Sequence, residues 1–426
     1  MIMAAKKFDL VIFGASGFTG QFVVDEVCKV AEEENLTWAV AGRNMTKLQK
    51  VLNEASNRTD KNLLETPIII ADTSSKSSLE EMAKQAKIVL NCVGPYRFFG
   101  EPVVKACIEY GAHHLDISGE PQYLETMQLL YHTKAKENNV LIIGATGFDS
   151  VPAESGIMYL QDKFKSGQLT NVESFLSIQT GPAGGAINFA TYESAVYGLS
   201  NAKELVSLRK SLYSEPMPKV QHRLPKRSGL FFSEEVRKWC LPFMGSDKSV
   251  VYRTIRSHFS GGVLKSPIEF FPYMCMSSLF SALKFVMFGV IFNFLCHSSV
   301  GRWLLLKFPH ILTMGAVKKG GPSREQIDGT SFTMTFVGRG FDSLESMSNG
   351  DKPDRQITAR LTAPELGYVT TPICMVQCAA IVLKEKDQMQ YKSGVLTPGA
   401  AFFGTSLIQR LDQHNVKIET VSDSKV

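Results

Sequence analysis

The sequence predicts an α/β protein with two domains: an N-terminal domain built on a parallel sheet, and a second, α+β domain that carries an apolar insert. Three observations predict this fold class. Short apolar runs alternate with helical patterns of about 10–15 residues through the first third of the chain, which indicates strands joined by helical crossovers. The alternation ends after Gly147. Residues 270–317 are then strongly apolar.

Buried strands and amphipathic helices account for the first domain. Helices cover both faces of a parallel sheet, so its strands are expected as continuous apolar runs. Such runs occupy residues 8–13, 37–41, 67–71, 88–93, 114–117 and 140–143. Between them, apolar side chains recur at helical spacing. The expected helices are residues 18–31, 44–55, 76–86 and 101–110.

The second domain mixes both kinds of element. Strand-like runs occupy 172–178 and 250–256, helical patterns occupy 188–212, 370–384 and 401–413, and a proline-containing surface loop occupies 213–230. Residues 330–338 and 355–362 predict an antiparallel pair of strands, with 340–354 as the connecting loop. The last residues are polar and are expected to fray.

Composition excludes several classes of protein. The chain is 44% hydrophobic and 20% charged, which is typical of globular proteins, and its net charge of +5 is too small to indicate nucleic-acid binding. The charge is uneven, because residues 219–324 contain 16 lysines and arginines and 4 acidic residues, a net charge of +12. The eight cysteines form neither a CxxC pair nor a zinc-type pattern. We therefore expect a reducing compartment and no metal site.

A glycine-rich turn follows the first strand and opens the first helix. It consists of Gly14, Ala15, Ser16, Gly17, Phe18, Thr19 and Gly20. Glycines let the backbone approach a pyrophosphate, and the helix N-terminus supplies free N–H groups and positive partial charge. The same glycines also occur in ordinary turns, but this position inside a run of βα units is the one a Rossmann site requires. The turn therefore predicts dinucleotide binding.

The residues after the second and third strands indicate which dinucleotide binds. An NAD-type domain places Asp or Glu at the end of the second strand, whereas this chain has Arg43. A guanidinium can form charge-assisted hydrogen bonds to a 2′-phosphate, which favours NADP as the cofactor. The alternative is that Arg43 is a solvated loop arginine. Asp72, after the third strand, is expected either to border the adenine or to cap the following helix.

Polar, glycine-bearing turns follow the next three strands and define a cleft at the carboxyl edge of the sheet. They are residues 91–97, 116–120 and 144–152. Simple turn chemistry is the alternative for each of them. Val93, Gly94 and Pro95 are expected to contact the cofactor at its nicotinamide end. Candidate proton donors or orienters are Tyr96, Asp116, Glu120 and Asp149, of which Tyr96 and Asp149 are the predicted catalytic residues.

Several segments together resemble the saccharopine dehydrogenase-like oxidoreductases. They are GASGFTG, AGR, NCVGPYRFFGEPVVKACIEYGAHHLDISGE, GFDSVPAESG and LTPGAAF, and the resemblance covers nearly the whole chain. It implies a Rossmann domain at residues 1–150, an inserted second domain at 151–390 and a C-terminal return to the first domain at 391–426. Related trans-acting enoyl reductases act on lipid chains, and animal members of the family occur in lipid droplet and membrane fractions.

The apolar insert, residues 270–317, predicts membrane association. Lys284 is the only charged residue in 270–296, and a helix that is apolar all round is buried in a core or in lipid. Basic residues on both flanks favour the cytosolic face. A single span would separate the C-terminal segment from the first domain, so we expect a monotopic hairpin or interfacial helix pair on a membrane or lipid droplet. A buried core or a homodimer interface is the alternative.

Two hypotheses follow from these observations. In the first, the protein is an NADP-dependent oxidoreductase whose small-molecule, lipid or acyl-type substrate is delivered from a membrane or lipid droplet surface. In the second, it is a non-catalytic nucleotide-binding scaffold or redox sensor on lipid droplets. Both hypotheses predict cofactor binding. They differ in whether the protein converts a substrate into a product.

Overall fold

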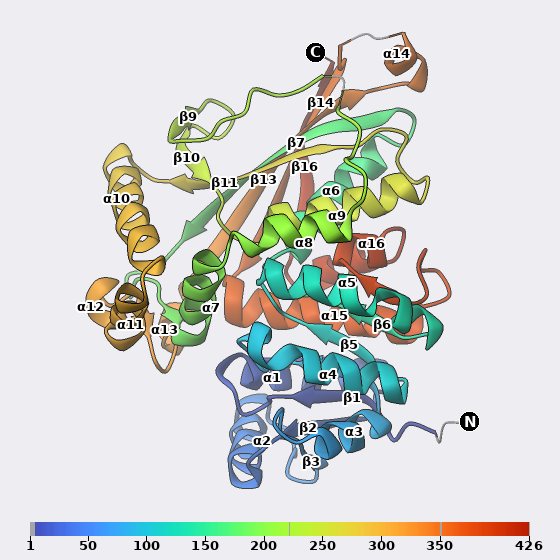
Figure 1. The fold of residues 1–426 in the computed structure, drawn as a ribbon, viewed down its shortest axis with the longest axis vertical. Coiled ribbons are helices and arrows are strands. Elements are labelled where there is room, and N and C mark those ends of the chain that lie inside the picture. Colours follow the sequence, from blue (N-terminus) through green and yellow to red (C-terminus); the bar gives the residue numbers. More distant parts are fainter. Residues whose placement is uncertain (1–4, 221, 350–351, 426) are drawn as a thin grey trace.

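The structure is a computed structural model that describes residues 5–220, 222–349 and 352–425 (Figure 1). Its N-terminal part is a seven-stranded parallel sheet with the order β15-β6-β5-β4-β1-β2-β3. The strands are β1 (Phe8–Phe13), β2 (Trp38–Gly42), β3 (Ile68–Ile70), β4 (Ala86–Asn91), β5 (His113–Asp116), β6 (Leu141–Ile143) and β15 (Gly394–Leu396). The helices that alternate with them are α1 (Phe18–Glu34), α2 (Met45–Thr59), α3 (Lys76–Gln85), α4 (Tyr96–Tyr110), α5 (Pro121–Glu137) and α6 (Val151–Lys163). The predicted α/β fold class is confirmed.

A second sheet of seven strands, mostly antiparallel, forms the other half of the molecule, with the order β16-β14-β13-β7-β11-β10-β9. Its strands are β7 (Gln168–Gln179), β9 (Phe231–Ser233), β10 (Lys238–Pro242), β11 (Glu269–Met276), β13 (Ser331–Phe341), β14 (Arg355–Pro364) and β16 (Lys417–Lys425). Helix α6 packs tightly on this sheet, because a Cβ on Gly156 would lie 2.2 Å from the ring of Phe336. The antiparallel pair expected near 330–362 is confirmed as β13 and β14.

Two expectations for the second domain are wrong. Residues 250–256 lie in helix α9 (Asp247–Ser260). Its buried side chains recur at helical spacing, although four of them are β-branched: Val250, Val251, Thr254 and Ile255. The helix expected at 188–212 is divided into α7 (Phe189–Ser200) and α8 (Glu204–Leu212). Five short elements also belong to this part of the chain: β8 (Ile187–Asn188), β12 (Val317–Lys318), α13 (Arg324–Asp328), α14 (Leu344–Ser348) and the π-helical turn η1 (Leu366–Thr370).

The apolar stretch 270–317 consists of two structurally different parts. Its first residues belong to β11, an interior strand of the second sheet, so they are core and not membrane-facing. The rest forms α10 (Leu279–Cys296), α11 (Ser299–Lys307) and α12 (Pro309–Leu312). Figure 1 shows these three helices protruding from one side of the molecule. We call residues 279–314 the apolar hairpin.

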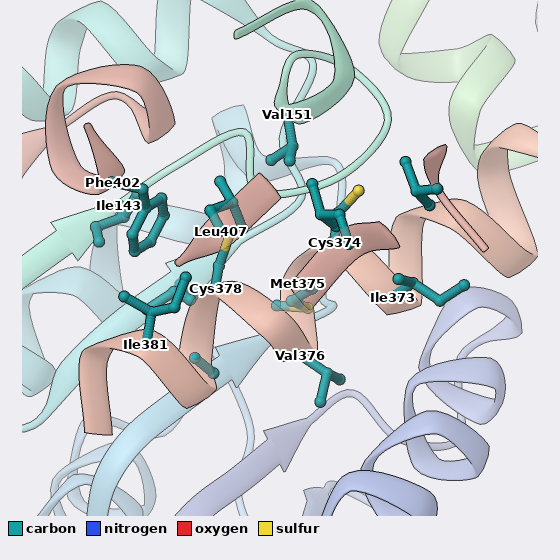
Figure 2. Close-up of a cluster of buried hydrophobic side chains, with 14 of the residues drawn as sticks. Ile143, Val151, Ile373, Cys374, Met375, Val376, Cys378, Ile381, Phe402 and Leu407 are labelled. Atoms are coloured by element: carbon teal, nitrogen blue, oxygen red, sulfur yellow. The ribbon is translucent and has the colours of Figure 1, made fainter. Parts of the chain in front are cut away.

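The chain returns to the first domain through α15 (Thr371–Lys384), which packs against α1 and against β4 and β5. Figure 2 shows the apolar cluster on α15, where Cys374 and Cys378 lie among side chains from β6, α6, α16 (Pro398–Phe402) and α17 (Leu407–Gln413). Strand β15 then pairs with β6. The last strand does not stay in this domain or fray. Instead, β16 pairs with β14 in the second sheet, where Arg355 donates hydrogen bonds to both carboxylate oxygens of Asp423.

Candidate cofactor site and active site

The glycine turn forms a tight cradle between β1 and α1. Gly14 has a φ of +85°, and a Cβ on Gly20 would lie 2.2 Å from the Gly14 carbonyl oxygen, so neither position accepts another residue without a shift of the backbone. Gly17 precedes α1 and supplies no side-chain cap. The N–H groups of the first helical turn therefore have no acceptor inside the helix and are available to a pyrophosphate. This arrangement fits a dinucleotide.

The loop after β4 lies directly against the glycine turn. A Cβ on Gly14 would lie 2.7 Å from the Val93 Cγ2 atom and 3.2 Å from the Cys92 carbonyl carbon. The Asn91 side chain holds this loop by accepting a hydrogen bond from the Val93 N–H at 3.1 Å. The glycine turn and the start of the loop after β4 are thus brought together through Gly14 and Val93 at one edge of the sheet. The Phe18 ring points away to Tyr368, with ring centroids 4.8 Å apart, so only its backbone faces the cradle.

Arg43 and Asp72 lie at the neighbouring strand ends. Arg43 follows β2, is exposed, and forms no ion pair with any residue that the structure describes. The Asp72 Oδ1 atom accepts hydrogen bonds from the backbone and hydroxyl of Ser74, which hold the pKa of this carboxyl below its usual value, and the positive charge of Arg43 acts in the same direction. Asp72 therefore shapes the turn before α3, while the Arg43 guanidinium is free for an incoming phosphate.

Replacing Arg43 with alanine is expected to weaken NADPH binding by about 10–100-fold, because hydrogen bonds to a charged group contribute about 1.5–3 kcal/mol. NADH binding should change little, since NADH has no 2′-phosphate. Calorimetric titration of both variants with both dinucleotides measures the difference. An equal loss for NADPH and NADH, or no loss for either, would contradict this assignment of Arg43.

Tyr96 is buried, and its hydroxyl donates a hydrogen bond to the Asn91 carbonyl oxygen at 2.8 Å. Burial raises the pKa of this phenol well above its usual value. The backbone N–H of Tyr96 donates to the Glu120 carboxylate, which also accepts from the Arg97 N–H and so caps α4. In this structure Tyr96 is directed into the protein, not into a cleft. Its position fits a residue that orients the loop after β4, and Glu120 fits a helix cap.

Asp116, at the end of β5, is the centre of a buried polar network. Its carboxylate accepts hydrogen bonds from the Ser118 N–H at 3.0 Å, the Ala145 N–H at 3.2 Å and the Tyr123 hydroxyl at 3.0 Å. Burial raises the pKa of Asp116 to about 6 and lowers that of the adjacent His114 to about 3. These bonds connect the turn after β5 to the turn after β6.

Asp149, in the turn between β6 and α6, is the half-buried carboxyl of this edge. Its Oδ2 atom would lie 2.7 Å from a Cβ on Gly119, so a larger residue there would displace the carboxylate. Burial raises the pKa of Asp149 to about 6. The next residue, Ser150, has a φ of 153°, which is rare for a residue other than glycine. Such strain commonly accompanies functional sites.

Two further carboxyls lie close to Asp149, and neither is among the site residues predicted from the sequence. Asp247 opens α9, and its Oδ1 atom accepts a hydrogen bond from the Ser150 hydroxyl at 3.4 Å. Burial, together with the charges of Asp149 and Glu154, raises the pKa of Asp247 well above its usual value. Burial raises the pKa of Glu154 on α6 to about 7. Nothing local in the sequence marks these two acids, because the packing of α9 on α6 brings them together.

This cluster predicts a pH-dependent stability. The folded protein binds more protons than the unfolded chain wherever a carboxyl pKa is raised by folding, so stability is lost as the pH rises from about 4 upward. Asp247→Asn removes one such group and is expected to raise the melting temperature at pH 8 while changing it little at pH 4. Thermal unfolding at both pH values tests this. The control Asp162→Asn, at an exposed position on α6, should change neither value.

Comparisons with known proteins agree with this geometry. Residues 10–143 match the family model described as saccharopine dehydrogenase NADP binding domain, and NADP is the cofactor of this domain. The human saccharopine dehydrogenase-like oxidoreductase is 45% identical, with 100% of both chains covered. A Caenorhabditis elegans protein named lipid droplet localized protein is 35% identical over 98% of this chain and 99% of its own.

Two more distant proteins share the full length of the chain. A Mycobacterium tuberculosis protein named putative trans-acting enoyl reductase is 27% identical, with 99% of both chains covered. The structure of yeast saccharopine dehydrogenase has a TM-score of 0.55 and 12% identity, and the match covers 97% of this chain and 100% of that one, which shows a shared fold. With an NADP-binding cradle, a second sheet domain and full-length relatives of this kind, the chain belongs to the saccharopine dehydrogenase-like oxidoreductase family.

Proposed function

We propose that this NADP-dependent oxidoreductase acts on a lipid or acyl-type substrate that it takes from the surface of a membrane or lipid droplet. The observation that carries the proposal is the apolar hairpin. Only 11% of α10 is buried inside the protein, and its mean hydropathy is 2.0. Exposed apolar side chains on the hairpin include Phe280, Leu283, Met287, Val290, Ile291, Phe294, Val300, Trp303 and Ile311. A continuous apolar surface of this kind marks an interaction site.

The chain connections support attachment to one side of a lipid surface. The hairpin begins after β11 and ends before β13, and both strands pair with β7 in the same sheet. A span across a bilayer would place β13 and α15 on the far side, away from the domain they complete. A second long apolar helix, residues 366–384, is 78% buried and belongs to the core. The hairpin therefore suits an interfacial anchor, for which a lipid droplet monolayer is one host.

Asp149 supplies the proton in this proposal. The cofactor provides the hydride when it is bound, and the protein must add or remove one proton at the substrate. Asp149 is half-buried at the carboxyl edge of the sheet, and its pKa of about 6 keeps a fraction of the carboxyl protonated near neutral pH. Asp247, behind it, stays protonated to higher pH and can hold a proton beside Asp149. Tyr96 takes a positioning role through Asn91.

The test is NADPH consumption by the purified full chain, assayed with enoyl and ketoacyl substrates in the presence and absence of phospholipid vesicles. We expect substrate-dependent oxidation of NADPH that vesicles stimulate. Tight NADPH binding without turnover of any substrate would favour the second candidate, a non-catalytic nucleotide-binding scaffold or redox sensor.

A further inference from the structure

Two of the eight cysteines face each other across two antiparallel strands. Cys240 on β10 and Cys275 on β11 are direct cross-strand partners, and their Sγ atoms lie 3.5 Å apart. Directly opposed residues in such a ladder have Cα atoms about 4.5–5.5 Å apart, which is inside the range of disulfides. The two thiols can therefore be joined without moving the backbone. Cys240 is buried, whereas Cys275 is partly exposed.

The surroundings of Cys275 favour its thiolate. The Cys240 thiol, the Ser177 hydroxyl and the positive charge of Lys238 all stabilise the negative sulfur, and together they lower the pKa of Cys275 despite its burial. The Lys238 Nζ atom donates a hydrogen bond to Ser177 at 3.0 Å, which holds both groups beside the sulfur. Partly exposed cysteines in electropositive surroundings are the reactive ones. Cys92, the other partly exposed cysteine, has its pKa raised to about 12 by burial.

We propose that Cys240 and Cys275 form a redox-active dithiol that a hydroperoxide oxidises to a cross-strand disulfide. The Cys275 thiolate attacks the peroxide, so an S–O bond forms, the O–O bond breaks, and the leaving oxygen departs as water or an alcohol after taking a proton. The Cys240 thiol then loses its proton and attacks the Cys275 sulfur. The S–S bond forms, the S–O bond breaks, and the Cys275 hydroxyl leaves as water with the proton from Cys240. Two thiols are oxidised and one peroxide is reduced, with two electrons transferred.

The position of the dithiol connects it to the apolar hairpin. Strand β11 ends at Met276 and α10 begins at Leu279, so Cys275 lies at the base of the hairpin, as Figure 1 shows for the two elements. A hydroperoxide can reach this site from water or from an oxidised lipid beside α10. Hydrogen peroxide and a fatty-acid hydroperoxide are the two probes that separate these sources. The disulfide would tie β10 to β11 where the hairpin leaves the sheet.

The experiment uses the reduced full chain, treated with equimolar hydrogen peroxide or fatty-acid hydroperoxide, followed by alkylation and peptide mass mapping. We expect a Cys240–Cys275 disulfide that dithiothreitol reverses, while the other six cysteines stay alkylated as thiols. A faster reaction with the lipid probe in the presence of vesicles would identify lipid as the source, and an equal or faster reaction with hydrogen peroxide would identify water. If both cysteines remain free thiols after treatment with hydrogen peroxide and also after treatment with the fatty-acid hydroperoxide, the proposal is overturned.

Two substitutions separate the attacking cysteine from its partner. In C240S the first step proceeds and the second does not, so dimedone should label Cys275 as a sulfenic acid. In C275S neither a disulfide nor a sulfenic acid should form. The matched control C296S, at a buried cysteine of α10, should give the wild-type yield of disulfide. A dimedone adduct on Cys240 in C275S would reverse the assigned order of the two thiols and so contradict the mechanism. The wild-type peptide map decides the proposal even where a variant fails to fold.

Discussion

Replacing Asp149 with asparagine is expected to lower kcat by about 10²–10⁴-fold, the usual contribution of a positioned general acid or base. An amide of the same shape keeps the packing against Gly119 but cannot donate or accept the proton. NADPH binding should be unchanged, because the glycine cradle is built from other residues. The measurement is NADPH oxidation with the best substrate found, together with calorimetric titration of NADPH.

The pH profile adds an independent readout for Asp149. A proton donor must carry its proton, so the wild-type rate of reduction should fall as the pH rises through about 6, the value to which burial raises this pKa. The residual activity of the asparagine variant should lack this decline. Asp162→Asn serves as the control and should keep both the rate and the profile. Full activity of Asp149→Asn would remove the residue from the mechanism, whatever the fate of the membrane proposal.

Replacing three exposed apolar residues of the apolar hairpin with glutamate is expected to abolish binding to lipid. Phe280, Met287 and Phe294 follow one another at intervals of seven along α10 and are 68%, 61% and 76% exposed, so glutamates at these positions disturb no core packing. Each apolar side chain that leaves lipid costs about 1.5–3 kcal/mol, so the triple variant should bind vesicles about 10³-fold more weakly or worse. Flotation with anionic vesicles and with artificial lipid droplets measures the loss.

A matched control separates the hairpin from general surface hydrophobicity. Leu64, Leu130 and Val206 are also exposed but lie outside the hairpin, and glutamates at these three positions should leave flotation unchanged. A wild-type chain that dimerises in solution and does not float, together with a monomeric hairpin variant, would instead identify the hairpin as a homodimer interface. Deletion of residues 273–317 is a poorer test, since it removes four residues of the interior strand β11.

The order of βα units could be predicted from the sequence because their strands are buried on both faces and are continuously apolar. The cradle of residues 14–20 and its contact with Val93 follow from that order, since parallel strands end at the same edge. Residues 250–256 were predicted as a strand because Val, Tyr, Thr and Ile favour strands locally. They form a helix because tertiary packing buries one helical face of this segment. Residues 270–276 were grouped with the apolar insert because they carry no charge, yet they form part of the interior strand β11, whereas the following helix α10 is exposed.

The candidate site was predictable only where a motif places a residue at a strand end. The direction of the Tyr96 side chain depends on packing between α4 and α5, which no local pattern records. Asp247 was missed for a related reason. A carboxyl at the start of a helix is ordinary in sequence, and it becomes unusual only when α9 buries it against the turn that carries Asp149.

The first domain is built from two parts of the chain that lie far apart in the sequence, and this affects how the protein folds during synthesis. Its sheet ends with β15, and its face is covered by α15, so the ribosome completes this domain more than two hundred residues after β6 has left the exit tunnel. Until then the edge of β6 and the apolar surface beneath α15 are uncovered, at the same time as the newly made apolar hairpin. A chain that stops before residue 371 would lack the pieces that close its nucleotide-binding half. Chaperones are therefore expected to hold the nascent protein through most of its synthesis.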